Sequence, residues 1–226
     1  MNKALRHILP LLLCACSMAA QAQLTYHYYQ THGGSISVGG TGQFTTPLDP
    51  QTNYGAYIIP TANGSASTIV SNQRQYTTDS LGFVTSLQFH PVAWAGVEFN
   101  YGFTHYSERF AFNYGTSSAI QKVSVPTDAH EATGAYSFHP RHIPFQPFLN
   151  IGGGAIDFAP SSASNQWRGA GLAEVGFDLP TPNKHWAFRV EGRSLFYRAP
   201  NFYTPAISTS TWRSTEEPSI SSVYRF

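Results

Sequence analysis

The sequence is poor in charge and in cysteine. Charged residues make up only 11% of the 226 residues, and the two cysteines, Cys14 and Cys16, both lie near the N-terminus. The segment that contains them has a basic head, an apolar core and the small-x-small sequence Ala-Gln-Ala at residues 20–22, which is typical of a secretory signal peptide. We therefore predict that residues 1–22 are removed and that residues 23–226 form the mature domain.

Loss of this leader would leave no thiol, disulfide or cysteine-based metal site in the mature chain. It would also leave 11 basic against 12 acidic residues, because the leader holds two of the 13 Lys and Arg and none of the 12 Asp and Glu. A formal charge of −1 without a basic stripe excludes a typical nucleic-acid-binding protein. An alternative processing site exists, since residues 13–16 resemble a bacterial lipobox that would leave a lipidated Cys16.

Long apolar runs are also missing. No mature segment reaches the roughly 18 consecutive apolar residues that a transmembrane helix needs. The composition favours strands and turns instead, with 15% aromatic residues, 19 Gly and 15 Pro. A mature chain of this kind can enter a membrane only as a β-barrel.

The clearest pattern is a pair of alternating stripes at residues 81–103, which predicts a β-hairpin turned at residues 90–93. Successive side chains of a strand point to opposite faces, so a period of two indicates two different environments. The polar stripe includes Ser86, Gln88 and Glu98. The apolar stripe consists of Leu81, Phe83, Thr85, Leu87, Phe89, Val97, Phe99, Tyr101 and Phe103.

The same alternation recurs and predicts about eight strands, joined alternately by long polar loops and short turns. An even number of antiparallel strands with loops at one end and turns at the other describes an outer-membrane barrel. We therefore predict an all-β fold, an eight-stranded antiparallel up-and-down transmembrane β-barrel; a soluble sheet with one wet face is the alternative. The loops are expected near 45–77, 107–122, 159–165 and 198–213, and the turns near 90–93, 139–145 and 179–184.

Charge decides which parity faces lipid. Arg189 and Arg193 share one face of a single predicted strand, and each would cost roughly 2–4 kcal/mol near the midplane of the lipid face. The charged parity must therefore point inward, where eight strands enclose a space that side chains can fill. Since unpaired buried charges are costly, we predict that these charges pair into a plug. The predicted lumenal ion network is Glu98, Glu131, Arg168, Glu174, Arg189, Glu191 and Arg193.

The C-terminal segment carries a resemblance to a known group. Ile220, Tyr224 and Phe226 share one parity and resemble the terminal signal that the outer-membrane assembly machinery reads, although Pro218 and Ser222 depart from its apolar positions. With the leader and the hairpins, the mature chain resembles the OmpA-like/OmpX-like small barrel superfamily over its whole length. The resemblance implies a barrel domain only, with no peptidoglycan-binding domain, and lumenal ion pairs.

We expect this barrel to act without enzymatic activity, as a structural or adhesin-like surface-recognition protein in the outer membrane of a Gram-negative-type cell envelope. Its expected partners are outer-membrane lipid and lipopolysaccharide, the barrel assembly machinery and an unknown extracellular ligand, and we expect a monomer. Loops carry recognition on barrels. The largest, at residues 45–77, has only Asp49 and Arg74 as charges and suits a partner interface or a lid.

Two other functions stay open. His105 and Ser107 share the outward parity and resemble the His-x-Ser of lipid A deacylases of the PagL type. Such chemistry needs a carboxylate to orient the imidazole; Glu108 has the wrong parity, and no other acid is evident in the sequence. The second alternative is a narrow channel for small solutes through the lumen.

Cofactors and metals are not predicted. The run Gly152-Gly153-Gly154 fits neither nucleotide-binding spacing, so it is interpreted as a bend in a strand. Four histidines fall beside the short turns and are interpreted as polar rim residues rather than metal ligands. The four are His90, His139, His142 and His185. Asp157 and Asp178, near strand ends, are expected to be solvated.

Overall fold

The computed structural model describes residues 33–51, 55–61, 64–114, 120–140, 145–202 and 211–226. The predicted leader and His142 lie outside these ranges. Within them, no helix is long and apolar enough to cross a membrane. The strands are β1 (Gly33–Thr45), β2 (Leu48–Gln51), β3 (Gly55–Thr61), β4 (Gly64–Thr77), β5 (Ser80–Val92), β6 (Ala95–Tyr114), β7 (Ile120–Phe138), β8 (Pro147–Pro160), β9 (Gln166–Pro180), β10 (Trp186–Arg198) and β11 (Trp212–Arg225).

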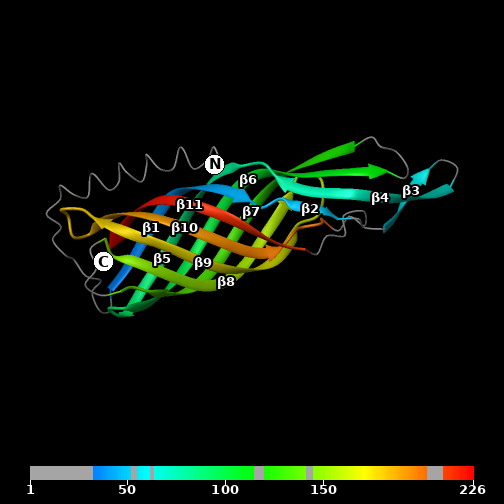
Figure 1. The fold of residues 1–226 in the computed structure, drawn as a ribbon. Helices are drawn as coiled ribbons and strands as arrows, with labels where there is room; N and C mark the ends of the chain where they lie inside the picture. The colour runs from blue at the N-terminus through cyan, green and yellow to red at the C-terminus, as the bar shows by residue number, and fades with distance from the viewer. Residues whose placement is uncertain (1–32, 52–54, 62–63, 115–119, 141–144, 203–210) are drawn as a thin grey trace.

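Eight of these strands close into a ring, which confirms the predicted fold (Figure 1). The order is β6-β5-β1-β11-β10-β9-β8-β7, and β7 pairs back onto β6; every pairing is antiparallel. Phe226 completes the closure, because its backbone N–H and C=O bond with Gly34 at 3.0 and 3.1 Å. Closure satisfies the backbone groups that an open sheet would leave at its edges.

The predicted hairpin has the expected orientation. Phe99 pairs with Leu87 and Phe103 with Phe83, and the ring of Phe99 is on the outer surface, 57% exposed. Glu98, one residue away, is 1% exposed in the lumen. The outer wall therefore carries the aromatic and aliphatic side chains, as a surface in contact with hydrocarbon requires.

The prediction of long loops at residues 45–77 and 107–122 is wrong. Most of the first range forms β2, β3 and β4, and β6 and β7 extend through most of the second. β5 pairs with the first part of β6, as far as the pair formed by Gly82 and Thr104. β4 pairs with the later part of β6, starting from the pair formed by Thr77 and Glu108. Among the described strands, this addition pairs with β6, and together with the ends of β6 and β7 it projects beyond the barrel (Figure 1). Strands that face lipid on one side alternate between polar and apolar residues. Because the projecting sheet lies beyond the lipid-facing wall, its sequence lacks this alternation, and the strands were not predicted.

The lumen is divided into two levels. Toward the projecting end, apolar side chains of strands β6 to β10 pack together. Phe202, which follows β10 and has a φ of 47°, packs with them. Toward the short turns, which we call the turn end, the buried side chains are mostly polar. The apolar cluster includes Tyr106, Phe110, Phe112, Ala129, Ile156, Phe158, Leu172, Leu195, Tyr197 and Phe202.

The glycine run lies inside β8 and allows this strand to approach β7 closely. A Cβ at Gly154 would lie 2.0 Å from the carbonyl oxygen of Ala132, and one at Gly152 would lie 2.0 Å from that of Gly134. Real side chains cannot occupy that space, so the curvature of this wall depends on these two positions.

We predict that Gly154→Val prevents closure of the barrel. The added side chain would meet backbone atoms that cannot move aside, at a cost of roughly 3 kcal/mol or more. The measurement is the mobility of unheated protein on a denaturing gel, where a closed barrel migrates differently from boiled protein. Gly192→Val is the matched control, because nothing lies within 4 Å of a Cβ at Gly192. A normal heat-dependent shift for Gly154→Val would contradict the close approach.

Candidate functional site

Arg189 on β10 is the centre of the polar level of the lumen, and its side chain is 1% exposed. Its Nε donates a hydrogen bond of 2.8 Å to Oδ1 of Asp178 on β9. Its terminal nitrogens donate to Oε1 of Gln88 at 2.9 Å and to Oε2 of Glu98 at 3.3 Å. The guanidinium also lies 4.5 Å from the ring centroid of Phe148. One side chain therefore joins β10 to β5, β6 and β9 across the barrel.

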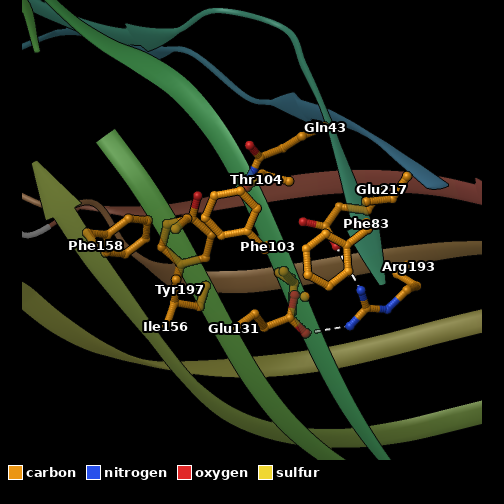
Figure 2. Close-up of a pocket in the computed structure, with 14 residues that line it drawn as sticks. Gln43, Phe83, Phe103, Thr104, Glu131, Ile156, Phe158, Arg193, Tyr197 and Glu217 are labelled. Atoms are coloured by element: carbon orange, nitrogen blue, oxygen red, sulfur yellow. Dashed lines mark hydrogen bonds and ion pairs between the residues drawn. The ribbon is translucent and has the colours of Figure 1, made fainter. Parts of the chain in front are cut away.

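Arg193 makes a second crossing, nearer the apolar cluster. Its NH1 donates to Oε2 of Glu217 at 3.0 Å, and its NH2 bonds to Glu131. Its Nε lies 3.5 Å from Oε2 of Glu174. Figure 2 shows the guanidinium held between the carboxylates of Glu131 and Glu217, which come from β7 and β11 on different sides of the ring.

A small cavity separates this ionic level from the apolar cluster (Figure 2). Glu131 and Arg193 line one side, while Phe158 and Tyr197, with ring centroids 5.5 Å apart, line the other. Gly102 opens this space, since a Cβ there would lie 3.2 Å from Oε2 of Glu131. The cavity is flanked by packed side chains on both levels, so the lumen resembles a filled core more than a pore.

A third ion pair lies within the apolar cluster. Arg213 and Glu108 form a bidentate contact, with both N···O distances at 2.8 Å and both side chains fully buried. The guanidinium also lies 5.2 Å from the ring centroid of Tyr197. A buried pair of this geometry satisfies both charges without solvent.

The structure places the seven predicted network residues inside the barrel, and six of them are buried. The six are Glu98, Glu131, Glu174, Arg189, Glu191 and Arg193. Arg168 is half-buried nearer the projecting end and donates to Oδ1 of Asn201 at 3.4 Å. It is therefore separate from the clusters around Arg189 and Arg193. Glu191 accepts a 2.6 Å hydrogen bond from Ser219.

Sequence reasoning missed several members of the network. Asp178 was expected to be solvated, but it is fully buried between Arg189 and Arg225, whose NH2 lies 3.0 Å from Oδ2 of Asp178. Its position at a strand end favoured solvation, although it shares the lumenal parity of Glu174. Glu217 could have been found, because it lies on the parity opposite to Ile220. Glu108 and Arg213 lay in ranges interpreted as a loop or the end of one.

The outer wall carries the residues of the enzymatic alternative. His105 and Asp128 pair directly across β6 and β7, and the His105 Nδ1 lies 2.6 Å from Oδ1 of Asp128. Their side chains are 65% and 46% exposed. Ser107 follows two residues later on the same face. No acid for this position was evident in the sequence, and only the register between the two strands reveals Asp128 beside His105.

The histidines near the turns differ from the expected rim residues. His90 and His139 are buried in the lumen, and their Nε2 atoms lie 2.9 Å apart. Burial, followed by the proximity of His90, lowers the pKa of His139 to about 3. His185 is exposed, and its ring bonds to the carbonyl of Arg225 at 2.9 Å. Among the described residues, no group of three or more His, Cys, Asp or Glu could hold a metal ion.

The terminal residues of β11 lie on the outer wall. Ile220 and Phe226 are 60% and 64% exposed, and Tyr224 is 39% exposed beside Trp186, with ring centroids 5.2 Å apart. The three residues therefore form part of the outer surface of the barrel.

A closed eight-stranded ring with an apolar outer wall and a lumen filled by side chains defines a β-barrel of the outer-membrane type. The outer membrane protein OprG from Pseudomonas aeruginosa has a similar fold, with a TM-score of 0.53 and 12% identity over 88% of this chain and 98% of that chain. No protein family matches this sequence, and no curated protein matches it.

Two further solved structures are similar at lower scores. Ail of Yersinia pestis, solved in complex with the heparin analogue sucrose octasulfate, has a TM-score of 0.40 and 14% identity over 87% of this chain and 100% of that chain. AlkL, solved in DMPC lipid bilayers, has a TM-score of 0.43 and 15% identity over 91% of this chain and 96% of that chain.

We predict that Arg193→Ala strongly destabilises the barrel. The change removes the cation shared by Glu131, Glu174 and Glu217, and stranding buried carboxylates costs about 3–5 kcal/mol. The free energy of unfolding in urea, followed by tryptophan fluorescence in lipid vesicles, measures the loss. Arg198→Ala is the control, because this exposed guanidinium lies over Trp212 and, within the described ranges, forms no ion pair with a lumenal carboxylate. Equal stability of the two variants would contradict the role of Arg193.

Proposed function

We propose that the protein is an integral outer-membrane barrel of the OmpA-like/OmpX-like superfamily that acts by surface recognition, with its turn end in the periplasm and its projecting sheet outside the cell. Residues 1–22 would direct secretion and then be cleaved, and insertion would use the assembly machinery through Ile220, Tyr224 and Phe226. The apolar outer wall supports the membrane location. It would contact outer-membrane lipid and lipopolysaccharide.

The observation that carries the recognition role is the filled lumen. The side chains that connect opposing walls of the barrel are those of Arg189, Arg193 and Arg213. The apolar cluster lies nearer the projecting end than Arg189 and Arg193. A protein whose interior is occupied by its own side chains has its outer surfaces available for function. Among the described residues, the projecting sheet of β2, β3 and β4 with the ends of β6 and β7 is the largest structure outside the ring.

A closed lumen also argues against the solute channel. The paired charges are bonded to one another across the barrel rather than arranged along an open path, and the apolar cluster lies in series with them. We infer that the protein functions as a monomer, since the ring is complete within one chain and needs no second copy to close.

We predict that adhesion is lost when β2, β3 and β4 are removed. Gln43 pairs with Ser80, so a short turn can join β1 directly to β5 in place of residues 46–79 without opening the ring. Cells that display the wild-type protein should bind to surfaces or to other cells, and cells that display this variant should not. The variant should still show the heat-dependent gel shift of a closed barrel.

The control is conductance in planar bilayers, which should be absent from both wild type and the shortened variant. Unchanged adhesion of cells carrying a correctly closed, shortened barrel would contradict recognition by the projecting sheet. Ohmic conductance of the wild type that changes on Arg189→Ala would instead support a small-solute channel.

The second candidate function is ester hydrolysis on outer-leaflet lipid A, and one specific contact favours it. Asp128 supplies the carboxylate that orients an imidazole, leaving His105 Nε2 able to accept a proton from a nucleophile. Ser107 is on the same face, where residues two apart on a strand lie roughly 7 Å apart. In such a reaction Ser107 Oγ would give its proton to His105 and attack the acyl carbonyl, and the protonated His105 would return the proton to the leaving sugar oxygen as the ester bond breaks. Water would then release the acyl group from Ser107 as the free acid.

We predict that lipid A acylation, measured by mass spectrometry of lipid A from producing cells, is the same for wild type and Ser107→Ala, as the non-enzymatic proposal requires. A wild type that removes an acyl chain, with activity lost in Ser107→Ala and reduced in Asp128→Asn, would overturn that proposal and support the hydrolase. Ser124→Ala, which is on the exposed part of β7, controls for the loss of a hydroxyl.

A further inference from the structure

Exposed cations are concentrated on one part of the surface. Among the residues that the structure describes, five Lys or Arg side chains are exposed. Lys184 is in a short turn, and Arg198 lies over Trp212. The other three, Arg74, Arg109 and Lys122, come from β4, β6 and β7, which are neighbours in the projecting sheet.

The register places these three side chains on one face. Arg74 and Lys122 both pair directly with Ala111, from its two sides. Arg109 occupies the next same-face position on β6, and its own partners are Tyr76 and Ser124. Directly paired residues point to the same face, and strands lie roughly 4.8 Å apart, so the three Cα atoms fall within about 10 Å of one another. We call this group the basic triad.

The basic triad has no acidic partner in the described part of the chain. None of its members belongs to an ion pair there, and the guanidinium of Arg74 lies 5.8 Å from the ring centroid of Tyr76. The adjacent acid Glu108 points to the opposite face and is bound by Arg213. Asp128, on the same face, is bound by His105. Both of these acids are therefore bound elsewhere, and among the described side chains the positive charge of the basic triad has no ion-pair partner.

The height of the basic triad matches that of lipid headgroups. A strand tilted about 45° rises roughly 2.3 Å per residue along the barrel axis, which places Arg109 about 32 Å from Ala95 at the turn end. The apolar band of such barrels is about 25 Å tall. His105, two rows below Arg109, is therefore near the end of that band, and the basic triad lies beyond it.

We propose that Arg74, Arg109 and Lys122 form a binding site for the phosphate groups of lipopolysaccharide in the outer leaflet. Three cations from three adjacent strands complement a phosphorylated disaccharide, whose acyl chains lie against the apolar wall below. Tyr76, between Arg74 and Arg109, offers a ring at the depth where aromatic side chains meet headgroups. This inference depends on the proposed membrane location and not on adhesion.

The test compares wild type with the triple variant Arg74→Gln, Arg109→Gln and Lys122→Gln. Each full-length protein, in phosphatidylcholine nanodiscs, is titrated with fluorescent bisphosphorylated lipid A, and in parallel with the same lipid lacking both phosphates. Wild type should bind the phosphorylated lipid on the order of tenfold or more tightly than the triple variant, and this difference should shrink at high salt.

The matched control is Lys184→Gln with Arg198→Gln, which removes exposed cations away from the basic triad and should bind like wild type. The heat-dependent gel shift verifies that every variant is a closed barrel. Equal affinity of wild type and the triple variant, or equal affinity of wild type for the lipid with and without phosphates, would overturn the proposal.

Discussion

The structure depends on two guanidinium groups that cannot face hydrocarbon. Arg189 and Arg193 lie on one face of β10, and that face must be the inner one. The choice propagates around the ring, because direct partners in a sheet point the same way. It fixes the inward direction of Glu98, Glu131 and the other acids, and with them the outward direction of the aromatic rows.

The same two cations explain how a small ring holds its shape. Hydrogen bonds of the sheet connect each strand only to its neighbours, whereas Arg189 on β10 reaches β5 and β6, and Arg193 on β10 reaches β7. Each crossing satisfies carboxylates that would otherwise be stranded in a region without bulk water. The apolar cluster, which includes Phe158 and Tyr197, fills the level of the lumen toward the projecting end.

Sequence alone was sufficient wherever one face meets lipid. The alternation at residues 81–103 and the charge cost at Arg189 together predicted the ring and its orientation. They failed at residues 45–77, because a sheet beyond the lipid-facing wall needs no alternation. Contacts such as His105 with Asp128 were also inaccessible, because they depend on the register between two strands, which a single-residue shift would change. Asp178 shows that proximity to a strand end says little about solvation.

The collinear arrangement of β4 and β5 along β6 has a mechanical consequence. The projecting sheet is joined to the barrel by uninterrupted hydrogen-bond ladders of β6 and β7, rather than by a flexible linker. A pull on the projection would therefore load these ladders in shear, with many bonds sharing the force at once. Because these strands continue without a break from the barrel wall into the projecting sheet, the pairing between β6 and β7 ties the sheet directly to the wall.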